Sequence, residues 1–124
     1  MTDNQIMLLK LKIANKTLSH TATTEFVTIG RSSDCEFVVE NDDFSRKHCM
    51  ITFKGSYVFI TDLGSKNGVI VDGKRITPNQ AVPIYPASKI LLANLYQLML
   101  PDGTEIKALS GLELQLEKIV PRRG

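Results

Sequence analysis

The stretch from Ile29 to Gly68, IGRSSDCEFVVENDDFSRKHCMITFKGSYVFITDLGSKNG, alternates short apolar runs with three polar clusters. Each cluster stands at an end of an apolar run, so we predict a loop at the tip of a strand in each case. Together the clusters supply arginine and lysine side chains, hydroxyls and an asparagine amide, groups able to hold a phosphate and a segment of peptide backbone. The clusters are Gly30-Arg31-Ser32-Ser33, Ser45-Arg46-Lys47-His48 and Gly64-Ser65-Lys66-Asn67-Gly68.

Short runs of β-branched, aliphatic and aromatic residues continue along the first hundred residues, separated by turn signals. Lys54-Gly55-Ser56 and Asp72-Gly73 predict hairpin turns, the second of type I′. The connections are too short for the helical crossovers of a parallel α/β sheet. We therefore predict an all-β fold, a β-sandwich of about eleven short strands with the binding loops at one end. Strands are expected at 5–13, 17–23, 25–29, 36–39, 49–53, 57–61, 69–71, 80–84, 89–92 and 95–100.

The C-terminal part of the chain gives a weaker pattern. We assign residues 1–104 to one domain and 105–124 to an extension, either a strand or a frayed tail. Asp102-Gly103 predicts a turn that returns the chain through 104–109. The residues at 112, 114 and 116 alternate as in a strand, whereas those at 112, 116 and 119 share one helical face. The abrupt ending suggests a piece of a longer protein.

Composition excludes several classes of partner. The 124 residues are 43% hydrophobic and 23% charged, which is typical of a soluble globular domain. The net charge of +2 and the absence of Trp give neither a basic face nor a base-stacking platform, so no nucleic-acid partner is expected. No apolar stretch approaches the length that spans a bilayer, so no membrane partner is expected.

Cys35 and Cys49 are the only cysteines. The N-terminal residues Met-Thr-Asp-Asn-Gln are polar and not basic, unlike a secretory signal. We therefore expect a cytoplasmic protein whose cysteines are reduced and lie in or near the core. No Cys/His spacing suits a zinc site, and no metal or other cofactor is predicted.

The first two clusters carry candidate phosphate ligands. Arg31 follows a strand, and a guanidinium gives a phosphate two parallel charge-assisted hydrogen bonds, although surface arginines are commonly just solvated. Ser45 offers a hydroxyl and neighbouring main-chain N–H groups, but a loop serine also bonds its own backbone. His48 stands at the start of an apolar strand, so we interpret it as a structural residue that fixes the loop carrying Ser45.

The third cluster carries candidate contacts to a peptide. Asn67-Gly68 is a turn dipeptide, and the Asn67 amide offers both a donor and an acceptor to an extended main chain. Ser65 and Lys66 add a hydroxyl and a positive charge.

The order of the clusters, Gly-Arg, then Ser-x-x-His, then Gly-Ser-x-Asn-Gly, resembles the forkhead-associated (FHA) domain of the bacterial type, a phosphothreonine-binding module. The resemblance extends from about Leu8 to Leu100, within an all-β pattern. It is carried by Ile29-Gly30-Arg31, Ser33-Asp34-Cys35, Phe44-Ser45-Arg46-Lys47-His48 and Asp62-Leu63-Gly64-Ser65-Lys66-Asn67-Gly68.

The resemblance implies a role for each matching residue. It implies phosphate binding by Arg31, Ser45, Lys66 and Ser65, peptide-backbone binding by Asn67 and Arg46, and structural support by Gly30, His48 and Gly68. The implied partner is a phosphothreonine-containing protein or peptide, such as a Ser/Thr kinase or its substrate; the oligomeric state stays open. The acidic residues Glu40, Asp42 and Asp43 just before Ser45 predict selection against acidic peptide flanks.

Two other functions compete with this one. A domain of the same fold can bind a partner without phosphate, for instance as a scaffold in a secretion complex, but intact Arg31, Ser45 and Asn67 argue against that. An enzyme would use Ser45 or Cys49 as a nucleophile with His48 as its base. Cys49 and His48 are adjacent in a strand, so their side chains point to opposite faces and are badly placed to act together. For Ser45 with His48, the sequence offers no evident third residue to orient the base and no oxyanion hole. We therefore predict a non-catalytic signalling adaptor or scaffold downstream of a Ser/Thr kinase.

Overall fold

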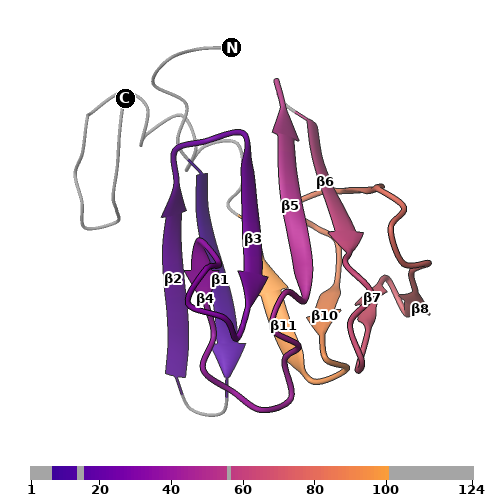
Figure 1. The fold of residues 1–124 in the computed structure, drawn as a ribbon. Coiled ribbons are helices and arrows are strands. Elements are labelled where there is room, and N and C mark those ends of the chain that lie inside the picture. Colours follow the sequence, from indigo (N-terminus) through magenta and orange to yellow (C-terminus); the bar gives the residue numbers. More distant parts are fainter. Residues whose placement is uncertain (1–6, 14–15, 56, 101–124) are drawn as a thin grey trace.

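The computed structural model describes residues 7–13, 16–55 and 57–100, and these form a sandwich of two β-sheets (Figure 1). The described residues contain eleven strands, so the predicted all-β sandwich is confirmed. The strands are β1 (Met7–Ile13), β2 (Lys16–Ala22), β3 (Phe26–Gly30), β4 (Phe37–Val38), β5 (Cys49–Lys54), β6 (Tyr57–Asp62), β7 (Val69–Val71), β8 (Lys74–Arg75), β9 (Val82–Ile84), β10 (Ile90–Leu92) and β11 (Tyr96–Met99). The predicted C-terminal extension lies outside the described residues.

The strands divide into a six-stranded and a five-stranded sheet. The first has the order β2-β1-β11-β10-β7-β8 and the second the order β4-β3-β5-β6-β9. The short strand β4 pairs in parallel with β3, whereas the other pairs are antiparallel. The edge strands β2 and β4 lie on the same side of the sandwich (Figure 1), where the ring of His20 stacks on that of Phe37 with 5.4 Å between centroids.

Alternation of apolar and polar residues along the strands produces the core between the sheets. In β3, for example, Val27 and Ile29 are fully buried, whereas Phe26 is half exposed. This period of two directs one face of each strand inward, so that the apolar side chains of both sheets meet. The fully buried large side chains are Phe44, Leu9, Leu11, Ile29, Ile51, Ile60, Ile84, Ile90, Leu92 and Leu98.

The hairpin between β7 and β8 has the turn predicted from Asp72-Gly73. Both residues have positive φ angles, 51° and 85°, as a type I′ turn requires. The sequence pattern predicted the turn but not β8, because a two-residue strand is too short to show alternation. No helix among the described residues is long and apolar enough to cross a membrane.

The strand register brings the three polar clusters to one end of the sandwich. Ile29 in β3 pairs with Cys49 in β5, and Cys49 pairs with Asp62 in β6. The loop after β3, the loop before β5 and the loop after β6 therefore leave the sheet at the same level. The sequence prediction of loops gathered at strand tips is thus reproduced in the fold.

Candidate functional site

The first two clusters are joined backbone to backbone. The Arg31 N–H donates to the Ser45 carbonyl over 3.0 Å, and the Ser32 N–H donates to the Arg46 carbonyl over 3.1 Å. Gly30 makes this approach possible, because a Cβ at this position would lie 2.1 Å from the Arg46 carbonyl oxygen. Such a distance is far inside van der Waals contact, so only glycine fits here. The distance between the two loops is therefore set by main-chain contacts.

The Arg31 side chain extends along the second loop toward solvent. Its Nε donates to the Phe44 carbonyl over 3.0 Å, which fixes the plane of the guanidinium. A guanidinium carries five N–H donors, and no other hydrogen bond joins this one to the described part of the chain. Arg31 is an exposed residue, so the remaining donors are available to an anion.

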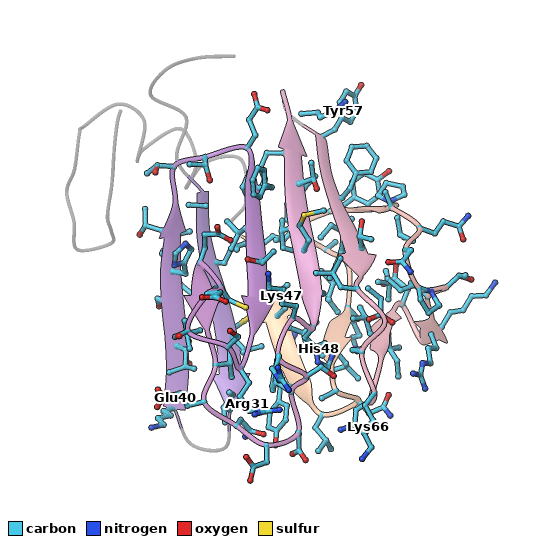
Figure 2. The ribbon with its side chains drawn as sticks, viewed as in Figure 1. Arg31, Glu40, Lys47, His48, Tyr57 and Lys66 are labelled. Carbon is cyan, nitrogen blue, oxygen red and sulfur yellow. The ribbon has the colours of Figure 1, made fainter. Side chains whose placement is uncertain are left out.

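Ser45 connects the second cluster to the third. Its Oγ accepts a hydrogen bond from the Lys66 main-chain N–H over 3.0 Å. Because this bond uses a lone pair, the Ser45 hydroxyl keeps its own hydrogen for another acceptor. Figure 2 shows Arg31 and Lys66 at the same end of the sandwich, with Lys66 exposed to solvent.

His48 connects the second and third clusters from the buried side of the loops. The Ser45 N–H donates to His48 Nδ1 over 3.1 Å, so this nitrogen is an acceptor and the proton is on Nε2. Nε2 in turn donates to the Gly68 carbonyl over 2.9 Å. The residue is fully buried, and burial lowers the pKa of its imidazole. The Gly68 carbonyl and the charge of Asp62 oppose this lowering of the pKa, and the charge of Arg75 adds to it. With Nδ1 accepting and Nε2 donating, the imidazole is a hydrogen-bonded bridge between two loops.

The third cluster forms a tight turn held by its own side chains. The Ser65 N–H donates to Asp62 Oδ1 over 2.9 Å, and the Gly68 N–H donates to Ser65 Oγ over 3.0 Å. Ser65 is only 7% exposed. Of the four residues for which the resemblance implied phosphate contact, Ser65 thus directs its hydroxyl into the turn, whereas Arg31 and Lys66 are exposed and Ser45 is partly so.

Two features require glycine at position 68: the backbone conformation and the close contact with Arg75. The Gly68 φ angle of 83° lies in the left-handed region, and an added Cβ would meet Arg75 Nε at 2.5 Å. The guanidinium of Arg75 therefore lies against this glycine, and its Nη2 donates to the Lys66 carbonyl over 3.5 Å. Sequence analysis did not identify Arg75, because it belongs to the following hairpin and precedes no recognisable motif.

Asn67 is held by the loop that precedes Ser45. Its Nδ2 donates to the Asp43 carbonyl over 2.9 Å. The Asp43 carboxylate accepts a hydrogen bond of 2.7 Å from the Tyr96 hydroxyl, and the same carboxylate raises the pKa of Tyr96. Tyr96 also packs its ring against Phe44, with centroids 5.5 Å apart. Asp43 and Tyr96 are therefore supporting residues that sequence analysis missed, since 53 positions separate them along the chain.

Both cysteines are free and buried, as predicted. Cys35 donates through Sγ to the Arg46 carbonyl over 3.2 Å, so it supports the second cluster. Cys49 is fully buried beside Asp62, and burial together with this carboxylate raises the pKa of its thiol. Neither thiol has the lowered pKa that a nucleophilic cysteine needs. No group of metal-binding side chains occurs among the residues that the structure describes.

Comparison with known sequences identifies the family of this chain. A profile of the FHA domain matches residues 27–93, more than half of the chain and the whole range that holds the three clusters. The chain is 36% identical over 64 residues to the FHA domain-containing protein FhaB of Mycobacterium tuberculosis (strain CDC 1551 / Oshkosh), an alignment that covers 52% of this chain. The chain spans about two fifths (41%) of the length of that relative.

Solved structures share the architecture. The FHA domain of the CT664 protein from Chlamydia trachomatis superimposes with a TM-score of 0.68 and 28% identity, covering 78% of this chain and 97% of that chain. The yeast Dun1 FHA domain, solved in complex with a doubly phosphorylated (pT) peptide, has a TM-score of 0.64. It covers 81% of this chain and 76% of its own, and at 18% identity it supports the fold alone. This chain belongs to the FHA domain family, a family of phosphothreonine-binding modules.

Proposed function

We propose that this domain binds phosphothreonine peptides and acts as a non-catalytic adaptor or scaffold downstream of a Ser/Thr kinase. The observation that carries the proposal is the gathering of Arg31, Ser45 and Lys66 at one end of the sandwich, where the main-chain N–H groups of Arg31 and Lys66 both donate to Ser45. Three such groups together are suited to a dianionic phosphate, since each can contribute a charge-assisted hydrogen bond.

The phosphate would contact Arg31, Ser45 and Lys66 in different ways. The guanidinium of Arg31 is already oriented through its bond to Phe44, which leaves its terminal N–H groups for the phosphate oxygens. The Ser45 hydroxyl has its hydrogen available, and the Lys66 ammonium adds a mobile positive charge. Ser65, with its buried hydroxyl, would act by shaping the turn that presents Lys66.

The peptide main chain would pair with Asn67. One N–H of the Asn67 amide is used by the Asp43 carbonyl, so the second N–H and the Oδ1 acceptor are left for a ligand. An amide that offers one donor and one acceptor matches a residue of an extended peptide. Arg46 is exposed in the second cluster and would add a contact to the ligand.

One solved relative supports the proposal by what it binds. The EmbR protein of Mycobacterium tuberculosis, 27% identical in sequence, was solved in complex with a low-affinity phosphopeptide. A phosphothreonine peptide is accordingly the first ligand to test, from a kinase or from a kinase substrate.

The decisive experiment is a titration with three peptides that differ at one residue: phosphothreonine, phosphoserine and unmodified threonine. We expect micromolar affinity for the first, equivalent to about −8 kcal/mol, and a large loss without phosphate. Equal affinities for the phosphorylated and unmodified peptides would contradict the proposal and would favour a phosphate-independent scaffold of the same fold.

A further inference from the structure

The outer face of the five-stranded sheet carries apolar side chains that lie toward solvent in the described structure. Side chains alternate along a strand, and Phe53, Val58 and Val82 pack against the core. Their neighbours in β5, β6 and β9 therefore point outward. The strand register aligns one outward-facing residue from each of four strands in a row across the sheet: Phe26, Thr52, Phe59 and Pro83.

Two more rows flank this one. Met50 pairs with Thr61 on the side of the binding loops, and Lys54 pairs with Tyr57 on the far side. Tyr85, the next residue after β9, continues the far row. We call the uncharged residues of these rows that are largest or most exposed the outer-face patch: Phe26, Met50, Thr52, Tyr57, Phe59, Pro83 and Tyr85.

The outer-face patch combines exposed aromatic side chains with few charges. Phe26, Tyr57 and Tyr85 are 50%, 67% and 59% exposed. Lys54 is the one charged residue among the described outward-facing positions of β3, β5, β6 and β9. Glu36 lies at the margin, where its carboxylate accepts a hydrogen bond of 2.7 Å from the main chain of β3. Aromatic residues in the centre with charges at the margin are typical of an interaction surface.

We propose that the outer-face patch binds the same patch of a second copy of the chain, so that the domain forms a reversible homodimer. Two sheets pack face to face about 10 Å apart with interdigitating side chains, so a pleated apolar face fits another of its kind. A twofold axis makes such a contact self-complementary. Because Lys54 is the one charge on the described face, two copies meet without a cluster of like charges. Pro83, which lacks an N–H, disfavours pairing through the β9 edge instead.

The size of the outer-face patch predicts a weak dimer. Neighbouring strands lie about 4.8 Å apart and successive outward residues about 6.6 Å apart, so four strands and three rows with their side chains cover roughly 400–500 Å². Two copies would bury about 900 Å² in total, which is in the range of transient interfaces and below that of stable ones. We therefore expect a dissociation constant of the order of 100 µM.

The dimer would leave both candidate phosphate sites open. Figure 2 shows Tyr57 at the end of the sandwich opposite to Arg31 and Lys66. Only this consequence rests on the proposed function: two sites in one dimer would bind a doubly phosphorylated partner more tightly than a singly phosphorylated one.

The test measures association and its location together on the full chain. In sedimentation equilibrium, the mean mass should rise from 13.8 kDa toward twice that value between about 10 µM and 1 mM. Over the same range, the methyl resonance of Met50, in the patch, should shift with concentration in an NMR spectrum of labelled methionines. Met99 is the internal control, because it is half-buried in β11 of the other sheet and its resonance should stay in place.

Two variants assign the contact to the outer-face patch. Phe26→Glu and Tyr85→Glu place a carboxylate on opposite sides of it, and each should weaken dimerisation at least about tenfold. Leu95→Glu is the matched control, since Leu95 is 66% exposed but lies between β10 and β11 of the other sheet, and it should dimerise normally. Tyr85 stands outside the strands, so Tyr85→Glu still decides if Phe26→Glu fails to fold. All folded variants should bind a singly phosphorylated peptide as the unmodified chain does.

Two results would overturn the proposal. A mass that stays at the monomer value over the whole range would show that a second copy does not occupy the patch, as expected if another partner or another segment of the chain covers it. A dimer that leaves the Met50 resonance unmoved, or that persists in both glutamate variants, would have formed through a different surface. Neither result depends on phosphopeptide binding, so the proposed function is tested separately.

Discussion

The side-chain nitrogen of Asn67 lies 2.9 Å from the main-chain oxygen of Asp43, so the amide proposed to read the ligand backbone is already oriented by the neighbouring loop. Asp43 is held in turn by the hydroxyl of Tyr96 in β11. The orientation of Asn67 thus depends on a residue on a distant strand.

Tyr96→Phe should weaken phosphopeptide binding severalfold without touching the ligand. The substitution removes the hydrogen bond to the Asp43 carboxylate, whose contribution to stability is about 1.5–3 kcal/mol for a bond to a charged group. Isothermal titration and a urea melt measure the two effects. Tyr57→Phe is the matched control, because Tyr57 is 67% exposed and should tolerate the change. Identical behaviour of the two variants would contradict this role for Tyr96.

Arg31→Ala should lower phosphopeptide affinity by several kcal/mol, since it removes the paired charge-assisted hydrogen bonds to the phosphate. Arg31→Lys should bind with intermediate affinity, because it keeps the charge but loses the planar fork. The melting temperature should change little in either variant, because the side chain is exposed and has one hydrogen bond within the described chain. Near-normal binding by a folded Arg31→Ala variant would exclude Arg31 from the phosphate site.

Gly30→Ala should destabilise the fold by a few kcal/mol, because its Cβ would overlap the Arg46 carbonyl oxygen and push the first two loops apart. Gly64→Ala is the matched control. Gly64 has a positive φ of 82° but nothing within 4 Å of an added Cβ, so its substitution carries only the backbone cost of about 1 kcal/mol. Urea melts should rank the two variants in that order, and the reverse order would show that the contact at Gly30 relaxes easily.

Acidification should destabilise the domain through His48. Burial, the largest effect, lowers the pKa of His48 below the ordinary value of 6.5, so the unfolded chain binds a proton more readily than the folded protein. The stabilisation is therefore fully present above pH 6.5 and is lost as the pH falls toward the folded pKa. Melting temperatures measured from about pH 7.5 down to pH 5 should decrease.

His20→Gln controls for the other histidine, whose pKa is also lowered by burial. The pH dependence that remains in His20→Gln but disappears in His48→Gln belongs to His48. An unchanged slope in His48→Gln would mean that its imidazole is not the titrating group.

The sequence was sufficient to predict the three loop clusters and the strands other than β8, because both depend on local patterns. Alternation marks β3 and β5, and Asp72-Gly73 marks its turn directly. The supporting contacts could not be predicted in this way. The hydrogen bond from Tyr96 to Asp43 depends on which strands become neighbours in the fold. The contact of the Arg75 guanidinium with Gly68 depends on where the β7–β8 hairpin folds back.

Even within the recognised Gly-Ser-x-Asn-Gly motif, the contacts of Ser65 could not be predicted from the sequence. The sequence places it beside Lys66 and gives no sign of which way its hydroxyl turns. In the structure, the Ser65 N–H donates to the Asp62 carboxylate at the end of β6, and the Ser65 Oγ accepts from the Gly68 N–H, so the serine is fixed inside the turn.

The glycine at position 30 has a consequence for the thermodynamics of recognition. Because main chain meets main chain at Gly30, the spacing between the backbones of Arg31 and Ser45 is set by contacts and hydrogen bonds between the main chains. A ligand that binds as proposed would therefore not have to order two independent loops. Since ordering of loops subtracts from affinity, a small number of polar contacts would be enough to hold a short phosphorylated segment.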